Sequence, residues 1–205
     1  MTNKKTLALV ALIAVFVSVI GGFVVYAALT QRLDIEGSAN FVPESWKVNF
    51  KSGTLSNPPA LTGGADVHTA PSLTDTLISD FKVILTREGD SVTYTFDIEN
   101  TGYLDAKLTS YVLGTPSCEG TGTTKIADEA IVCSSDLSYT LKYVSGDLST
   151  NGLSAGGDVA INDMLKKQTT VKVALKLEYS SFAISIPTDM VEITGLDTYL
   201  IYTAQ

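Results

Sequence analysis

Histidine is almost absent from this chain of 205 residues, because His68 is the only one. A zinc protease of the helical type needs two histidines one turn apart, and a Ser-His-Asp triad would have to use His68, which lies in a loop rich in Gly, Thr and Pro. The chain also lacks a Gly-x-Ser-x-Gly elbow, a phosphate-binding loop with its lysine, and the spacing of an EF-hand. These absences predict that the protein is not an enzyme.

Paired carboxylates are the remaining candidates for chemistry. Asp75 with Asp80, and Glu88 with Asp90, have the acidic side chains that acid-base work or a structural calcium ion requires. Acids at strand ends and turns are also common solvent-exposed features of a β-sandwich. The sequence therefore predicts no catalytic residue, no metal site and no cofactor, with structural calcium left as an open alternative.

Basic residues are also few, since 14 Lys and Arg stand against 22 Asp and Glu, for a net charge of −8. Proteins that bind nucleic acid carry a basic patch or stripe. This balance therefore argues against nucleic acid as a partner. It favours a solvated acidic exterior that resists precipitation.

Cysteine occurs only twice, as Cys118 and Cys133. In an exported protein, two cysteines in one loop most often pair. Closing a ring of about 16 residues would stabilise the fold by roughly 3 kcal/mol on the chain-entropy model. A zinc site is the alternative, but it needs four ligands and only His68 is left to add a nitrogen. We therefore predict a disulfide between Cys118 and Cys133.

Charge is missing from Thr6 to Ala28, a run that follows the two lysines of "MTNKK". A signal peptide has a basic start, an apolar middle and a small-residue cleavage site, and Val25-Tyr26-Ala27 fits such a site, with signal peptidase cutting between Ala27 and Ala28. The run also reaches the roughly 20 residues of a membrane-spanning helix. Retention of residues 1–27 as an anchor is therefore the alternative to cleavage. Either way, the lysines place the rest of the chain outside the membrane, which it touches only through this segment.

Period-two alternation is the main pattern in the rest of the chain. From Ser91 to Val112, apolar and polar residues alternate on both sides of Asn100-Thr101-Gly102, which predicts a β-hairpin. Similar short segments, separated by turn-rich connections, predict about eight or nine strands in all. These segments are 33–36, 46–50, 81–85, 137–143, 171–179, 191–193 and 199–202, while 52–76 reads as a long surface connection with room for one brief strand and 160–167 as a helical turn.

The strand pattern predicts an all-β fold, an antiparallel β-sandwich or jelly roll of Ig-like type, preceded by a hydrophobic export helix. Three parts follow along the chain. Residues 1–27 form the signal peptide or anchor, residues 28–42 an N-terminal strand segment, and residues 43–205 a single sandwich domain.

Two stretches carry a family resemblance. The segment "IGGFVVYAALTQ", a strand centred on Trp46, and the element "GDSVTYTFDIENTGYLDAKL" together resemble the exported β-sandwich proteins around TasA and camelysin. Those proteins are matrix-fibre subunits of monoderm bacteria, with relatives among archaeal pili. The resemblance covers the N-terminal third and the Ser91–Val112 element, and it fades after Tyr111.

The resemblance implies a secreted, non-enzymatic subunit of a fibre at the cell surface or in a biofilm matrix. Residues 28–42 would be the strand that one copy donates to the next in a head-to-tail filament. Its expected apolar anchors are Leu29, Leu33, Ile35 and Phe41. Two alternatives stay open. In the first, the strand of residues 28–42 pairs within its own domain. In the second, the protein is a membrane-anchored ectodomain for binding or adhesion that uses its loops at 52–76 and 114–136.

Overall fold

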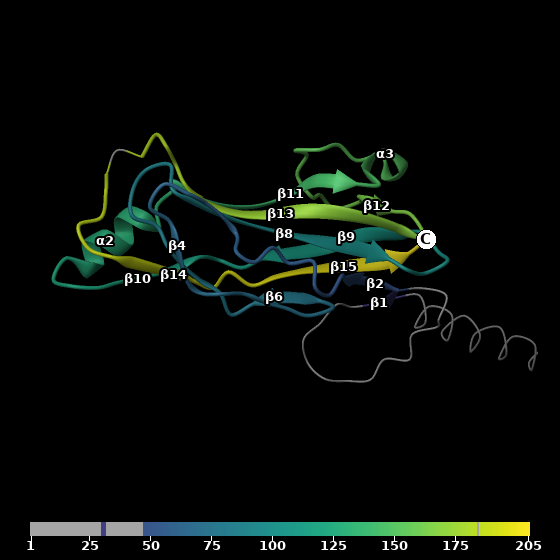
Figure 1. The fold of residues 1–205 in the computed structure, drawn as a ribbon, viewed down its shortest axis with the longest axis horizontal. Helices are drawn as coiled ribbons and strands as arrows, with labels where there is room; N and C mark the ends of the chain where they lie inside the picture. The colour runs from purple at the N-terminus through teal and green to yellow at the C-terminus, as the bar shows by residue number, and fades with distance from the viewer. Residues whose placement is uncertain (1–29, 32–46, 184) are drawn as a thin grey trace, which may run out of the picture.

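A computed structural model describes residues 30–31, 47–183 and 185–205, and it confirms the predicted all-β class (Figure 1). Among the described residues, every strand pair is antiparallel, and two helices, α2 and α3, accompany the strands. The helices are α2 Lys125–Val132 and α3 Leu148–Asn151. The strands are β1 Thr30–Gln31, β2 Val48–Phe50, β3 Ala60–Thr62, β4 Asp66–Thr69, β5 Ser72–Leu73, β6 Leu77–Ser79, β7 Lys82–Ile84, β8 Ser91–Asn100, β9 Ala106–Leu113, β10 Ser117–Gly120, β11 Leu137–Gly146, β12 Met164–Leu165, β13 Thr169–Tyr179, β14 Val191–Thr194 and β15 Thr198–Ala204.

The first layer is a sheet in the order β11-β13-β8-β2, which we call the long-strand sheet. Strands β8 and β13 pair from Ser91↔Glu178 to Asn100↔Thr169. Between Val92 and Ile98 in β8, and between Val171 and Tyr179 in β13, the inward-facing apolar side chains are buried and the residues between them are only half-buried, as the period-two pattern predicts. The pattern therefore identified both the strands and their inward faces correctly.

The outer edge of β8 is closed by residues 47–62 of the same chain. Strand β2 pairs with one end of β8 and β3 with the other. Between them, Thr54 Oγ1 accepts a hydrogen bond from the Asp97 N–H at 3.0 Å, and Ser56 Oγ accepts one from the Thr95 N–H at 2.9 Å. Side-chain hydroxyls thus replace the missing backbone partners.

The predicted hairpin between β8 and β9 is wrong. Both edges of β8 are already occupied, so β9 joins the opposite sheet, where it pairs with β15 and β12. The Asn100 side chain holds this crossover, because its amide donates to the Leu104 carbonyl at 2.9 Å and its oxygen accepts from the Gly102 N–H at 3.0 Å. The sequence identified the turn residues correctly, but this turn connects strands of the two opposing sheets and not two neighbouring strands of one sheet.

The second layer consists of two ladders that continue one another in register. The ladder β12-β9-β15-β6-β5 is followed along the same chain segments by β10-β14-β7-β4. Between the pairs Ile78↔Thr198 and Val83↔Ile193, residues 79–82 lie opposite residues 194–197, with no offset. We call this layer the split sheet, because one set of long strands is interrupted across its middle.

The molecule is elongated, and its two ends differ in content (Figure 1). The C-terminus and the turn after β8 lie at one end, and α2 lies at the other. We call the first end the base and the second the tip. The base comprises residues 101–107, 146–152, 162–169 and 203–205, together with Lys47, whose carbonyl accepts a hydrogen bond from the Thr101 N–H at 2.9 Å. The tip comprises residues 85–90, 121–136, 180–183 and 185–190.

Helix positions were predicted less well than strand positions. The cysteine-bounded loop contains α2, although no helical period was recognised there. The predicted helical turn at 160–167 is instead turn and strand β12, and residues 52–76 contain β3, β4 and β5 where one brief strand was expected. Within the described part of the chain, no helix has the length and apolar character needed to cross a bilayer.

Candidate functional site

The outer edge of β15 is covered only in part by neighbouring strands. On one side β15 pairs with β9 from Thr198 to Ala204. On its other side β6 pairs only with Thr198 and Tyr199, and β1 pairs with Tyr202 and Thr203. The last part of this edge is therefore covered by a strand of two residues.

This edge belongs to β15, a strand that also contributes side chains to the hydrophobic core. The side chains of Leu200 and Tyr202 are fully buried, and burial raises the pKa of the Tyr202 hydroxyl. An edge strand with a buried apolar face and free N–H and C=O groups is a template on which another strand can pair. This edge is thus suited to accept a strand.

Strand β1 comes from the N-terminal strand segment predicted at 28–42. Thr30 lies opposite Thr203 and Gln31 opposite Tyr202, in antiparallel register. The predicted cleavage residues Ala27 and Ala28 and the predicted anchors lie outside the described residues. These anchors are Leu29, Leu33, Ile35 and Phe41. Nothing in the sequence indicated that β15 is the strand on which this segment pairs.

The predicted disulfide is confirmed and lies at the tip. Cys118 in β10 and Cys133 at the end of α2 are bonded, with their Cα atoms 5.9 Å apart. Asp128 secures the same helix, because its carboxylate accepts hydrogen bonds from the Thr188 and Asp189 N–H groups at 2.9 and 3.1 Å. The Thr188 N–H is the main cause that lowers the pKa of Asp128. Helix α2 is therefore held to β10 by the disulfide and to the segment before β14 by Asp128.

Asp90, one of the candidate acid-base residues, has a structural role. Its buried carboxylate accepts hydrogen bonds from the N–H groups of Gly64 at 2.7 Å, Thr86 at 2.8 Å and Arg87 at 3.0 Å, and from the Thr86 hydroxyl at 3.0 Å. Burial alone would raise the pKa of Asp90, but these donors together hold it below its usual range. The carboxylate closes the loop that precedes β8, and its partner Glu88 is exposed.

His68 lies in strand β4 and not in a loop as the sequence suggested. Its imidazole contacts Glu192, which also accepts a hydrogen bond from Lys82 at 2.8 Å. The Lys82 contact is the main cause that lowers the pKa of Glu192. This trio links β4, β7 and β14 on one face of the split sheet.

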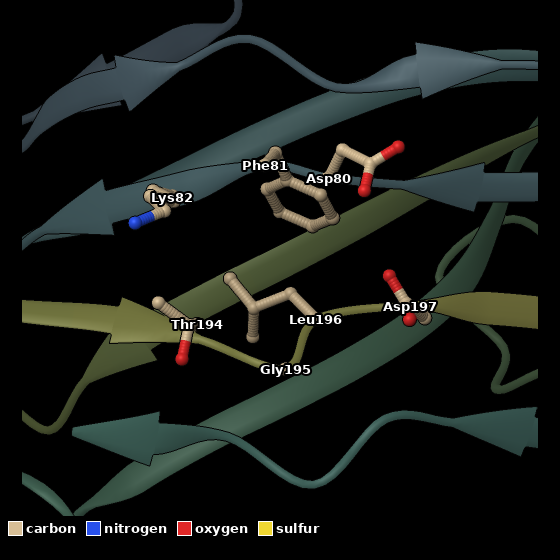
Figure 2. A pocket seen from close by; sticks show the side chains of 7 residues that line it. All are labelled: Asp80, Phe81, Lys82, Thr194, Gly195, Leu196 and Asp197. Atoms are coloured by element: carbon tan, nitrogen blue, oxygen red, sulfur yellow. The ribbon is translucent and has the colours of Figure 1, made fainter.

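A hollow of about 430 Å³ opens where the split sheet is interrupted, as Figure 2 shows. Asp80 and Asp197 lie on opposite sides of the gap, and Phe81 and Leu196 lie between them and Lys82. Asp80 has a φ of 63°, in the left-handed region. Among the described residues, no three His, Cys, Asp or Glu side chains are grouped closely enough to hold a metal ion.

Comparison of the chain with protein-family models, with curated proteins and with solved structures gave no match.

Proposed function

We propose that this protein is a non-enzymatic structural subunit of an extracellular fibre, in which the outer edge of β15 accepts the N-terminal strand of a neighbouring copy. The observation that supports this function is the pairing of Thr30 and Gln31 with β15. In a single copy the strand covers its own edge, and in a fibre the equivalent strand of a second copy takes the same place. A head-to-tail exchange of this kind does not close on itself and gives filaments.

The proposal includes export and a matching domain organisation. Residues 1–27 act as the hydrophobic export helix, signal peptidase cuts between Ala27 and Ala28, and residues 28–42 supply the exchanged strand. Residues 43–205 form the sandwich domain, of jelly-roll or Ig-like type, and the protein works outside the cell without a cofactor. The Cys118–Cys133 disulfide supports this location, because such bonds persist in oxidising compartments.

Mixed cysteine variants test whether the strand is exchanged. Thr30→Cys and Thr203→Cys are made in separate copies of the full chain, secreted together and oxidised. Because the two positions face each other across the β1–β15 pair, exchange between copies predicts a disulfide-linked dimer on a non-reducing gel. A mixture of Thr30→Cys with Ser138→Cys, on the long-strand sheet, is the matched control.

A second set of samples identifies pairing within one copy. If only the double variant Thr30→Cys/Thr203→Cys links, and does so within single chains, the strand stays in its own domain. The fibre function would then be rejected in favour of the anchored ectodomain for binding or adhesion. Intact mass of the secreted protein reports in the same samples whether residues 1–27 have been removed.

A further inference from the structure

The tip carries large apolar side chains that are exposed to solvent. Nine large apolar side chains of the described residues are exposed, and four of them lie at the tip. These four are Ile126, Phe182, Ile186 and Met190. Phe182 is the most exposed of the nine, at 89%. Single exposed apolar residues are common, but several at one end of an elongated molecule indicate an interaction surface.

A polar hollow of about 400 Å³ lies beside Phe182. Asp136, Glu178 and four serines line it together with Phe182. Glu178 forms an ion pair with Lys176 at 2.8 Å, whereas the Asp136 carboxylate has no ion pair among the described residues. Burial raises the pKa of the nearby Tyr179 hydroxyl, and Asp136 and Glu88 raise it further. The carboxylates of Asp136 and Glu88 therefore both lie close enough to Tyr179 to raise its pKa.

The ends of the molecule differ in charge. The described tip has six acids and two basic residues, and the base has three acids and four lysines. The tip residues are Glu88, Asp90, Asp128, Glu129, Asp136 and Asp189 against Arg87 and Lys125; the base residues are Asp105, Asp147 and Asp163 against Lys47, Lys107, Lys166 and Lys167. At the base, Lys166 pairs with Asp105 at 2.9 Å. The exposed Lys47 and Lys167 have no ion pair within the described part of the chain.

We infer that the tip docks onto the base of a second copy of this chain. In this contact Phe182 packs along the apolar stem of Lys47 or Lys167, and the lysine ammonium faces Asp136 and Glu88. A long lysine stem is able to cover an aromatic ring while its charge stays near carboxylates. Complementary charge selects the base over the acidic flanks of another copy. This contact relies on Lys47 and Lys167, whereas the strand exchange relies on the β15 edge at Tyr202 and Thr203. The two are therefore tested by separate variants.

Charge reversal with rescue tests the contact. The full chain is secreted as the tip variant Glu88→Lys/Asp136→Lys, the base variant Lys47→Glu/Lys167→Glu, and the combination of all four. Association is measured by sedimentation velocity and negative-stain microscopy at low and high salt. We expect each double variant to weaken association about tenfold or more, since like charges then face each other, and the combination to restore it. We expect salt to weaken association of the unmodified chain.

The matched control has the same charge change in the middle of the molecule. Asp158→Lys/Asp197→Lys replaces two exposed carboxylates away from both ends, and its association should equal that of the unmodified chain. Equal weakening in this control, or no rescue in the combined variant, would overturn the contact between tip and base. So would loss of association with Phe182→Ser while charge reversal has no effect, because the tip would then bind an apolar partner. The Thr30→Cys and Thr203→Cys link is scored separately, so failure of this contact and failure of strand exchange are distinguishable.

Discussion

The outer edges of β8 and β15 are closed in different ways. Beside β8, residues 47–62 run along the whole edge. At Thr95 and Asp97, backbone N–H groups of this segment donate to the carbonyls, and the hydroxyls of Ser56 and Thr54 accept from the N–H groups. Beside β15, β6 covers the first two residues and β1 covers two more. The β8 edge is thus closed by a segment that is continuous with the domain. The β15 edge is closed in part by the short strand β1, which precedes the domain in sequence by the fifteen residues 32–46.

The difference bears on which edge is able to exchange its partner. A strand of two residues contributes few hydrogen bonds, and an identical strand from a neighbour makes the same ones. Exchange therefore costs little at β15, as in domain swapping. At β8 the covering segment also contributes the buried side chains of Val48 and Phe50, so its removal would open the core. Of these two edges, the β15 edge is the one suited to exchange.

Deletion of residues 28–41 is expected to have the largest effect on assembly. The domain should stay folded, because β15 keeps its full pairing with β9 and the β8 edge is unchanged. Filaments should disappear from negative-stain images, while the melting temperature falls by only a few degrees, as for a loss of about 1 kcal/mol. Fibres built from the truncated protein would show that this segment is not the exchanged strand.

Asp90→Ala is expected to have the largest effect on stability. It leaves four donors around the loop before β8 without their charged acceptor. Loss of such a buried network costs about 3 kcal/mol or more. Urea unfolding of the variant measures this cost, with the exposed neighbour Glu88→Gln as the control. An unchanged free energy of unfolding in Asp90→Ala would contradict the structural role of Asp90.

Acid should destabilise the same loop and α2. The pKa values of Asp90 and Asp128 are lowered in the folded protein, so their contribution is complete above the carboxyl pKa of the unfolded chain, about 3.9. It is lost as pH falls through the lower folded values. The free energy of unfolding should therefore decrease from about pH 5 downward. Asp90→Asn/Asp128→Asn should flatten this decrease, and an equally steep curve in that variant would assign the effect to other groups.

The sequence predicted which side chains are buried better than it predicted which strands pair with each other. Alternation placed the side chains of β8 and β13 on the correct faces, because that choice depends on local period alone. It did not predict that residues 47–62 occupy the β8 edge, because edge partners depend on tertiary packing, and so the hairpin prediction failed. Helix α2 left a signal that was missed: Ala127, Glu129 and Ala130 favour a helix, and Asp128 and Val132 share its buried face. The pairing of Cys118 with Cys133 was predictable because the chain has no other cysteine.

Thr54→Val/Ser56→Ala should weaken the β8 edge by about 2 kcal/mol. The two substitutions remove the hydroxyl acceptors and leave the N–H groups of Asp97 and Thr95 without them. Hydrogen exchange should become faster at those two amides, while amides in β9 and β13 change only with global stability. Thr109→Val, which removes an exposed hydroxyl bond to the Ile201 carbonyl, is the control and should change stability far less. Equal losses in both variants would show that the hydroxyls do not close this edge.

The smallest effect on stability is expected from a substitution of Tyr94 in β8, which removes its buried hydroxyl. The Tyr94 hydroxyl is buried with no hydrogen-bond partner among the described residues, and burial raises its pKa to about 12. Its ring packs edge-on against Phe81, with centroids 5.6 Å apart, and phenylalanine would keep that contact. Tyr94→Phe should therefore raise the free energy of unfolding by about 1 kcal/mol. Tyr179→Phe, which loses a hydrogen bond of 2.6 Å to the Ser185 carbonyl, should lower it by a similar amount. If both variants are destabilised, the Tyr94 hydroxyl forms a hydrogen bond in the folded protein, and it is not an unsatisfied polar group of the long-strand sheet.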